Sequence, residues 1–260
     1  MNDALMVIFR KEIKNFFISP LFYLIAFLST FLMSIRFAMS LNEFAQAQMN
    51  AYFQMQAEPI LMNIHYSVFL QHISVLNLVF IFFIPALAMR LIAEEKKNRT
   101  FDLLMTSPIE SVDIVMGKFF SLMAVILALT AIAFGYIILT RKLFEFTWST
   151  TLIAFLGMVL VAAVYAAVCL FASSLTENVL IAFILGVVFN IAIWIFGGIS
   201  DNFDNPLTKV ILEQISLNNH LQAMMEGAVR TDGLIYFFSV IFLFCFLTER
   251  VIESSRWRSL

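Results

Sequence analysis

The sequence predicts an all-α polytopic membrane protein with six transmembrane helices, an amphipathic interfacial helix at its start and a short cytoplasmic helix between the second and third spans. Hydrophobic residues make up 62% of the chain and charged residues only 13%, with a mean hydropathy of +0.92. A soluble domain needs a more polar surface than this composition provides. Six apolar runs are each long enough to cross a bilayer, which takes about 20 helical residues. We expect residues 1–260 to form a single membrane domain.

The first 17 residues predict a helix lying on the membrane surface. Apolar side chains recur there at helical spacing, at Leu5, Met6, Phe9, Ile13, Phe16 and Phe17. A cleaved signal peptide is the alternative, but Asp3 and Glu12 interrupt the basic region and no small-residue cleavage site follows. Ser19-Pro20 should end this helix and turn the chain into the bilayer.

The six predicted spans lie near residues 21–41, 68–92, 115–140, 151–173, 179–199 and 233–251. Arg36 is the one charge well inside a span, about 22 Å along a helix that begins at Leu21. Its side chain can reach the far interface by extending along the helix. A functional charge within the membrane is the other interpretation.

The distribution of Lys and Arg predicts the orientation of the chain. Residues 1–17, 90–118 and 250–260 together hold eleven of these residues, whereas the segments on the opposite side hold four. Both termini and the segment between the second and third spans are therefore predicted to be cytoplasmic.

That cytoplasmic segment, Glu94 to Pro108, is a polar island between two apolar runs. A helix over 94–107 places Phe101, Leu104 and Met105 on one apolar face and the charged side chains elsewhere. Ser107-Pro108 should end it. The alternative is a solvated loop with ordinary charges.

The remaining connections are short. Residues 173–178 are too few for anything but a tight antiparallel hairpin between the fourth and fifth spans, and 200–232 is predicted to hold one or two short outer helices.

A small-residue face on the fourth span, formed by Ala162, Ala163, Ala166 and Ala167, suits close packing in lipid. Cys169 and Cys245 both lie in apolar runs, which favours packing over a disulfide.

Several catalytic chemistries are missing from the sequence. No Asp or Glu lies well inside a predicted span, so an ion-coupled carrier would lack its carboxylates. Gly117-Lys118 has no glycine five positions earlier, and a phosphate-binding loop is therefore absent. Metalloprotease and serine-hydrolase motifs and a metal-spaced Cys pair are also missing. The sequence predicts a chain with no catalytic residue and no metal site.

Four polar residues of the spans are candidates for a substrate path or for packing. His65 and His72 are seven residues apart, about 10.5 Å along a helix, which is a poor spacing for one metal ion; polar side chains facing a wet cavity are the favoured interpretation. Asn77 and Asn190 lie deeper, where an amide can find a partner across a helix interface or line a path. His72, Asn77 and Asn190 are the candidate path residues.

The chain resembles the permease subunits of type-2 ABC transporters, especially those related to the gliding-motility permease. The matching residues are Ile84-Pro85, Met89-Arg90-Leu91, Glu94-Glu95, Thr100, Leu103-Leu104, Thr106-Ser107-Pro108, Gly117-Lys118, Ser173-Ser174-Leu175-Thr176, Asn178, Ser216-Leu217, His220 and Gly227. The resemblance covers nearly the whole chain. One departure is Arg99, which stands where that family usually has a glycine before the threonine.

The resemblance implies a coupling helix at the polar island, touched by a cytoplasmic ABC ATPase that binds the ATP and magnesium this chain does not. The residues it assigns to coupling are Glu94, Glu95, Thr100, Phe101, Leu104 and Met105. It also implies a second permease subunit, contacts with membrane lipids, no nucleic acid, and residence in a bacterial cytoplasmic membrane. The expected function is the permease of an ATP-driven exporter. The alternative is a membrane anchor or assembly component of a motility or envelope apparatus.

Overall fold

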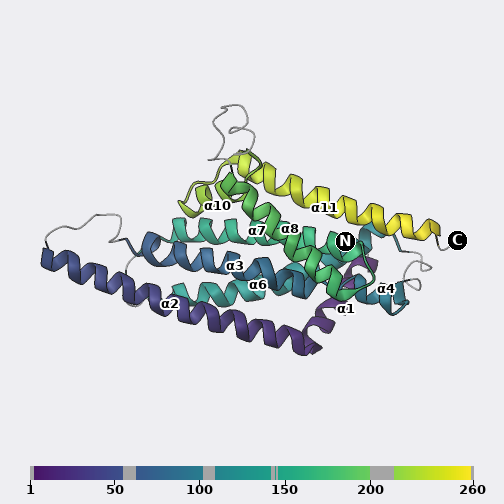
Figure 1. The fold of residues 1–260 in the computed structure, drawn as a ribbon, viewed down its shortest axis with the longest axis horizontal. Helices are drawn as coiled ribbons and strands as arrows, with labels where there is room; N and C mark the ends of the chain where they lie inside the picture. Colours follow the sequence, from purple (N-terminus) through teal and green to yellow (C-terminus); the bar gives the residue numbers. More distant parts are fainter. Residues whose placement is uncertain are drawn as a thin grey trace.

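The computed structural model describes residues 3–54, 63–101, 109–141, 144, 146–199 and 214–258, and every regular element in these ranges is a helix. The helices form an elongated bundle (Figure 1). Their bounds are α1 Asp3–Ile18, α2 Pro20–Gln54, the π-helical turn His65–Phe69, α3 Leu70–Ala88, α4 Ala93–Lys97, α6 Ser111–Thr140, α7 Trp148–Ser174, α8 Val179–Ile199, α10 Leu217–Met225 and α11 Thr231–Arg258.

The break between the first two helices falls where the sequence predicts it. α1 ends at Ile18 and α2 begins at Pro20, where the missing N–H of proline costs nothing because the first amides of a helix have no partner within it. The Ser19 amide donates to the Asn15 and Phe16 carbonyls at 3.1 Å each, which closes the last turn of α1. A helix over Asp3–Ile18 thus lies where the sequence predicts one over 1–17, and its position on the membrane surface stays a prediction.

Five helical segments of the described chain are long and apolar enough to cross a membrane: Pro20–Asn50, His65–Lys97, Ser111–Thr140, Trp148–Ser174 and Thr231–Ser255. They correspond to the predicted spans other than 179–199, usually with a few more residues at each end. α2 is the longest, and its 35 residues extend well beyond the predicted 21–41. The apolar part of α8, Val179–Ile195, is shorter than these five segments.

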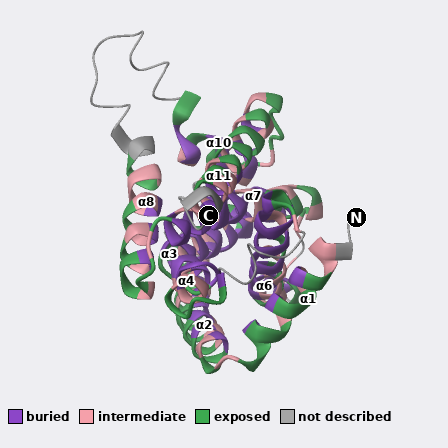
Figure 2. Ribbon diagram, turned by 90° about the vertical axis from the view of Figure 1, so that its right-hand side faces the viewer, coloured by how far each residue is buried: buried purple, intermediate pink, exposed green. Residues whose placement is uncertain are grey.

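α7 forms the centre of the bundle, packing against α3, α6, α8, α10 and α11. Most of the buried residues of the described chain belong to α3, α6 and α7 (Figure 2). The predicted small-residue face of α7 is buried, with Ala162, Ala166 and Ala167 at 0% exposure. α7 and α8 also form the predicted hairpin: the Asn178 side chain accepts from the amides of Leu180 at 2.9 Å and Ile181 at 3.4 Å, which caps α8.

Large apolar side chains are exposed on the outer faces of α2, α8 and α11. Phe27 is 68% exposed, Leu180 65% and Phe242 72%. A protein surrounded by water rarely leaves such extended apolar surface uncovered, whereas hydrocarbon solvates it at no cost. These faces are suited to contact with lipid tails.

The two chain ends and α4 lie at the same end of the bundle (Figure 1). The α10 helix lies at the opposite end, where the Met225 carbonyl contacts His65 Nε2 at 2.9 Å. This arrangement agrees with the prediction that both termini and the segment after the second span share one side of the membrane.

Gly117 lets α1 pack closely on α6. A Cβ atom at this position would lie 2.8 Å from Ile8 Cγ2 and 3.3 Å from the Leu5 carbonyl oxygen. Gly135, in the same helix, has open space within 4 Å of the equivalent position. The two glycines of α6 therefore have different structural roles.

We predict that Gly117→Ala lowers the stability of the purified protein by about 1–3 kcal/mol, because α1 has to move to relieve the overlap. Gly135→Ala is the matched control and should raise the stability by up to about 1 kcal/mol, since alanine favours a helix. Thermal unfolding in detergent, followed by intrinsic fluorescence, measures both. Equal effects of the two substitutions would contradict the close contact between α1 and α6.

Candidate functional site

The end of the bundle that holds both termini contains a polar cluster built from α1, α4, α6 and the end of α7. α3 ends at Ala88, and the chain turns through residues 89–92 before α4 begins. A helix start leaves amide groups without partners in the helix itself. The side chain of Ser173 provides the missing acceptor: its Oγ accepts hydrogen bonds from the amides of Ile92 at 3.3 Å and Ala93 at 3.1 Å. Ser173 thus fixes where α4 begins.

The same hydroxyl joins α4 to the helix before it. Ser173 Oγ donates to the Met89 carbonyl at 3.1 Å, so one side chain from α7 bridges both sides of the turn between α3 and α4. Lys96 adds a second attachment by donating from Nζ to the Ser174 carbonyl at 2.6 Å. α4 is therefore held against the turn between α7 and α8.

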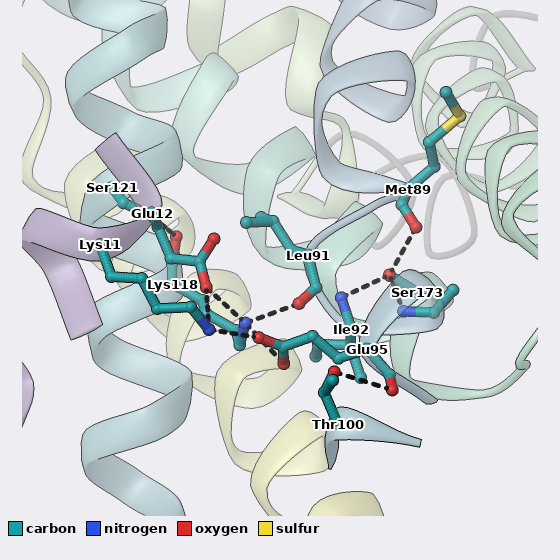
Figure 3. A network of polar contacts seen from close by, with 11 residues as sticks. Lys11, Glu12, Met89, Leu91, Ile92, Glu95, Thr100, Lys118, Ser121 and Ser173 are labelled. Carbon is teal, nitrogen blue, oxygen red and sulfur yellow. Dashed lines mark hydrogen bonds and ion pairs between the residues drawn. The ribbon is translucent and has the colours of Figure 1, made fainter. Parts of the chain in front are cut away.

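Lys118 is the centre of a buried charge network on the other side of α4 (Figure 3). It is 0% exposed, although it is a lysine. Its ammonium lies 2.9 Å from Glu12 Oε1 and 2.9 Å from Glu95 Oε2, and it donates to the Leu91 carbonyl at 2.6 Å. One side chain of α6 thus contacts α1, α4 and the turn between α3 and α4.

Lys11 completes the network from the surface. Its Nζ lies 2.9 Å from Glu95 Oε1 and 3.6 Å from Glu12 Oε1. Partial burial by itself lowers the pKa of Lys11, but the hydrogen bond and negative charge of Glu95, with a smaller effect of Glu12, raise that pKa above its ordinary value. Two lysines and two glutamates therefore alternate, and each buried charge faces an opposite one.

This network is costly to disturb. A buried ion is tolerated only while it is paired, because removing one partner leaves an uncompensated charge out of contact with water. Gly117 and Lys118 act together here: the glycine lets α1 approach α6, and the lysine then reaches Glu12 on α1. The structure gives this adjacent pair a physical role that the sequence pattern alone does not reveal.

The predicted helix over 94–107 is corrected by the structure. α4 ends at Lys97, and the chain turns at Asn98 and Arg99 before helical backbone resumes at Thr100 and Phe101. Arg99 has a φ of 57°, in the left-handed region that favours glycine. A left-handed residue just after a helix commonly ends it, which is why the predicted helix is interrupted.

The predicted coupling residues have different environments. Glu94 is half-buried, 3.9 Å from Arg90, and both line a cleft of about 520 Å³ beside α1. Glu95 belongs to the Lys118 network, and the Thr100 hydroxyl donates to its carbonyl at 3.3 Å. Phe101 is only 3% exposed, with the Lys96 ammonium 5.4 Å from its ring centre, so the protein itself covers it. Leu104 and Met105 lie outside the described residues.

A groove of about 660 Å³ lies nearer the opposite end of the bundle, among α2, α3, α8 and α10. Apolar and polar side chains alternate in its wall. It is lined by Arg36, Tyr66, Leu70, Gln71, Ser74, Val75, Asn77, Leu78, Trp194, Asn218, Leu221, Gln222, Met225 and Glu226.

Of the three candidate path residues, the structure places only Asn77 at this groove. Its side chain also accepts a hydrogen bond from the Tyr165 hydroxyl at 3.0 Å. His72 is 1% exposed, packs edge-on against Phe37 and contacts the Ala133 carbonyl at 3.1 Å through Nε2. Asn190 is fully buried between helices, 3.4 Å from the Ile81 carbonyl. The structure thus does not bring the three side chains together.

The family of ABC-2 family transporter proteins matches the chain over residues 6–248, from α1 to α11. The chain belongs to the ABC-2 transporter family. It is therefore a membrane-embedded transporter component, of a family whose permeases are generally non-catalytic and typically work with an ATPase subunit. No curated protein matches its sequence. The relation to the gliding-motility permease stays a prediction.

Sequence reasoning missed most of the polar cluster. Lys11, Glu12, Lys118 and Ser173 were not among the candidate site residues, although Gly117-Lys118 and Ser173-Ser174 belong to the resemblance. One signal was available: Lys118 lies beside an apolar run with Val115, Phe119 and Phe120 around it. A lysine in such surroundings needs a carboxylate partner.

We predict that Lys118→Met destabilises the protein by about 3–5 kcal/mol, because Glu12 and Glu95 then lose their buried counter-ion. Lys97→Met, at an exposed position of α4, is the control and should change the stability by less than about 0.5 kcal/mol. Adding Glu12→Gln to Lys118→Met should recover part of the loss. Thermal unfolding in detergent measures all three variants, and an undiminished stability of Lys118→Met would contradict the network.

A second prediction concerns the turn after α4. Arg99→Gly should raise the stability by about 1 kcal/mol, since glycine adopts the left-handed conformation without the cost that other residues incur. Arg99→Ala removes the same side chain but keeps the Cβ atom, and it should give no such gain. Unfolding midpoints of the two variants decide between a backbone effect and a charge effect: an equal gain from both would indicate charge.

Proposed function

We propose that this ABC-2 transporter is the permease subunit of an ATP-driven exporter, with α4 as the element that a partner ATPase moves. The observation that carries this proposal is the double attachment of α4. Ser173 and Ser174 tie it to the turn between α7 and α8, and Glu95 ties it to α1 and α6. A short helix joined to so many elements transmits a displacement to all of them, because packed helices move as rigid units.

In the proposed topology, α8 is the fifth of six spans and adds to the five that are long enough by themselves. It contacts α4 at one end of the bundle and α10 at the other, so it extends along the same length as its neighbours. An even number of spans is consistent with the two chain ends lying at one end of the bundle. The excess of Lys and Arg at that end supports its placement in the cytoplasm of a bacterial cell, with α1 lying along the inner face of the membrane.

The partners follow from the same arrangement. The ATPase supplies the ATP and magnesium site, because no phosphate-binding loop occurs in this sequence. A cytoplasmic partner can reach the exposed Lys97, Asn98, Arg99 and Thr100, together with the half-buried Glu94, whose side chain is 45% exposed. Phe101 supports α4 from within. A second permease subunit is expected to pair with this one, and the groove that contains Asn77 serves as part of the substrate path.

Photo-crosslinking tests this proposal. A photoreactive amino acid replaces Lys97, on α4, or Asn50, near the far end of α2, and each variant is purified together with the ABC ATPase that co-purifies with the unmodified protein. We expect crosslinks to the ATPase from position 97 and none from position 50, with a yield that differs between ATP and ADP. Crosslinks from position 50, or none from position 97, would contradict the assignment of α4 and of the cytoplasmic end.

A further inference from the structure

The groove among α2, α3, α8 and α10 contains a cation, Arg36, that forms no ion pair with any acidic residue the structure describes. Arg36 donates to Gln71 Oε1 at 3.4 Å, and Ser40 donates to the same oxygen at 3.0 Å. Gln71 is a neutral amide. Within the part of the chain that the structure describes, no carboxylate forms an ion pair with Arg36. Its guanidinium therefore has donors to spare and, among the described residues, a charge with no paired counter-ion.

The position of Arg36 makes this unusual. It lies in the middle of a helix whose neighbouring faces carry exposed apolar side chains such as Phe31, Leu32 and Ile35. A charge at such a position is costly unless something compensates it, and charges that persist in membrane helices generally have a functional partner. A guanidinium presents a planar fork of donors that matches the oxygens of a phosphate or carboxylate.

Glu226 is the one acidic side chain among the residues that line the groove. It lies at a different position from Arg36 along the axis of the bundle. Glu226 follows Met225, whose carbonyl contacts His65, whereas Arg36 lies beside Gln71. Those two levels are six residues apart on the same helical segment, about 9 Å at the rise of a helix. Glu226 also accepts a hydrogen bond from Gln222 at 3.3 Å and is exposed at the outer end of the groove. Glu226 therefore forms no ion pair with Arg36.

The rest of the groove offers an apolar surface beside this cation. Val75, Leu78, Leu221 and Trp194 line it, and Trp194 is 36% exposed. A volume of about 660 Å³ is within the range of pockets that bind small molecules. A molecule that contacts both Arg36 and this apolar wall needs an anionic group and an apolar chain.

We infer that the groove binds an amphiphile whose phosphate or carboxylate pairs with Arg36 while its apolar chain lies along Leu78 and Trp194. This inference rests on the proposed function, because it assigns a substrate class to the same path. It makes Arg36 the residue that selects for anionic substrates. Asn77, deeper in the groove, contacts the apolar part and is not the source of charge selection.

The fluorescence of Trp194 provides the test. The chain has three tryptophans, so replacing Trp148 and Trp257 by Phe leaves Trp194 as the only reporter. The protein, purified in maltoside micelles, is titrated with dodecyl phosphate brominated on its chain, and separately with dodecyl maltoside brominated in the same way. Bromine quenches a tryptophan that it contacts. We expect half-quenching by the phosphate at a concentration at least about tenfold lower than by the maltoside, as one charge-assisted pair provides.

Two variants identify the source of this preference. Arg36→Gln should reduce it to less than about twofold, whereas Arg230→Gln, which removes an exposed arginine paired with Asp232 outside the groove, should leave it unchanged. Arg36→Lys keeps the charge but not the fork, and an intermediate preference is expected. Size-exclusion chromatography confirms that each variant is folded. If Arg36→Gln fails to fold, competition by unbrominated dodecyl phosphate on the Trp194-only protein replaces it.

Equal quenching by the two probes would overturn the inference, as would retention of the preference in Arg36→Gln or a failure of unbrominated dodecyl phosphate to compete. Absence of quenching by either probe would overturn it as well. None of these results affects the crosslinking at Lys97, which tests the exporter proposal separately. Crosslinking without selective quenching would mean that the permease is driven by its ATPase but recognises its substrate elsewhere.

Discussion

The buried ammonium of Lys118 constrains the end of the bundle that holds both termini. Its charge has to be matched where water is excluded, and among the residues that the structure describes Glu12 and Glu95 do so at 2.9 Å. The first comes from α1 and the second from α4, which are otherwise peripheral. The ion pairs of this one side chain therefore hold α1, α4 and α6 in a single arrangement. Gly117 allows α1 to approach α6 closely enough for these pairs to form.

Much of the fold follows from local sequence signals. Apolar runs of sufficient length predict the spans, Ser19-Pro20 predicts the break before α2, and the brevity of residues 173–178 predicts the hairpin of α7 and α8. These signals succeed because a bilayer leaves few alternatives to a helix. Arg99 is the instructive failure. A helical pattern of apolar residues continued past it, but the backbone there is left-handed. Arginine itself gives no sign of that conformation, although the glycine that the family usually has at this position does.

The candidate site was harder to predict because its contacts join distant positions. Glu12 and Lys118 are 106 residues apart, and Ser173 contacts an amide 81 residues earlier. No periodicity in the sequence encodes such pairs. The path residues show the same limit: Asn77 lines the groove, whereas the similarly placed Asn190 faces Ile81 and Cys169. Which amide faces a groove depends on the rotation of each helix in the bundle.

The balance of the Lys118 network has an electrical consequence. Lys11, Glu12, Glu95 and Lys118 contribute two positive and two negative charges, which cancel over a short distance. Work done by a membrane potential scales with the net charge displaced, at about 2.3 kcal/mol per elementary charge per 100 mV. Shifting this junction as a unit along the membrane normal displaces no net charge, so voltage neither assists nor opposes its movement.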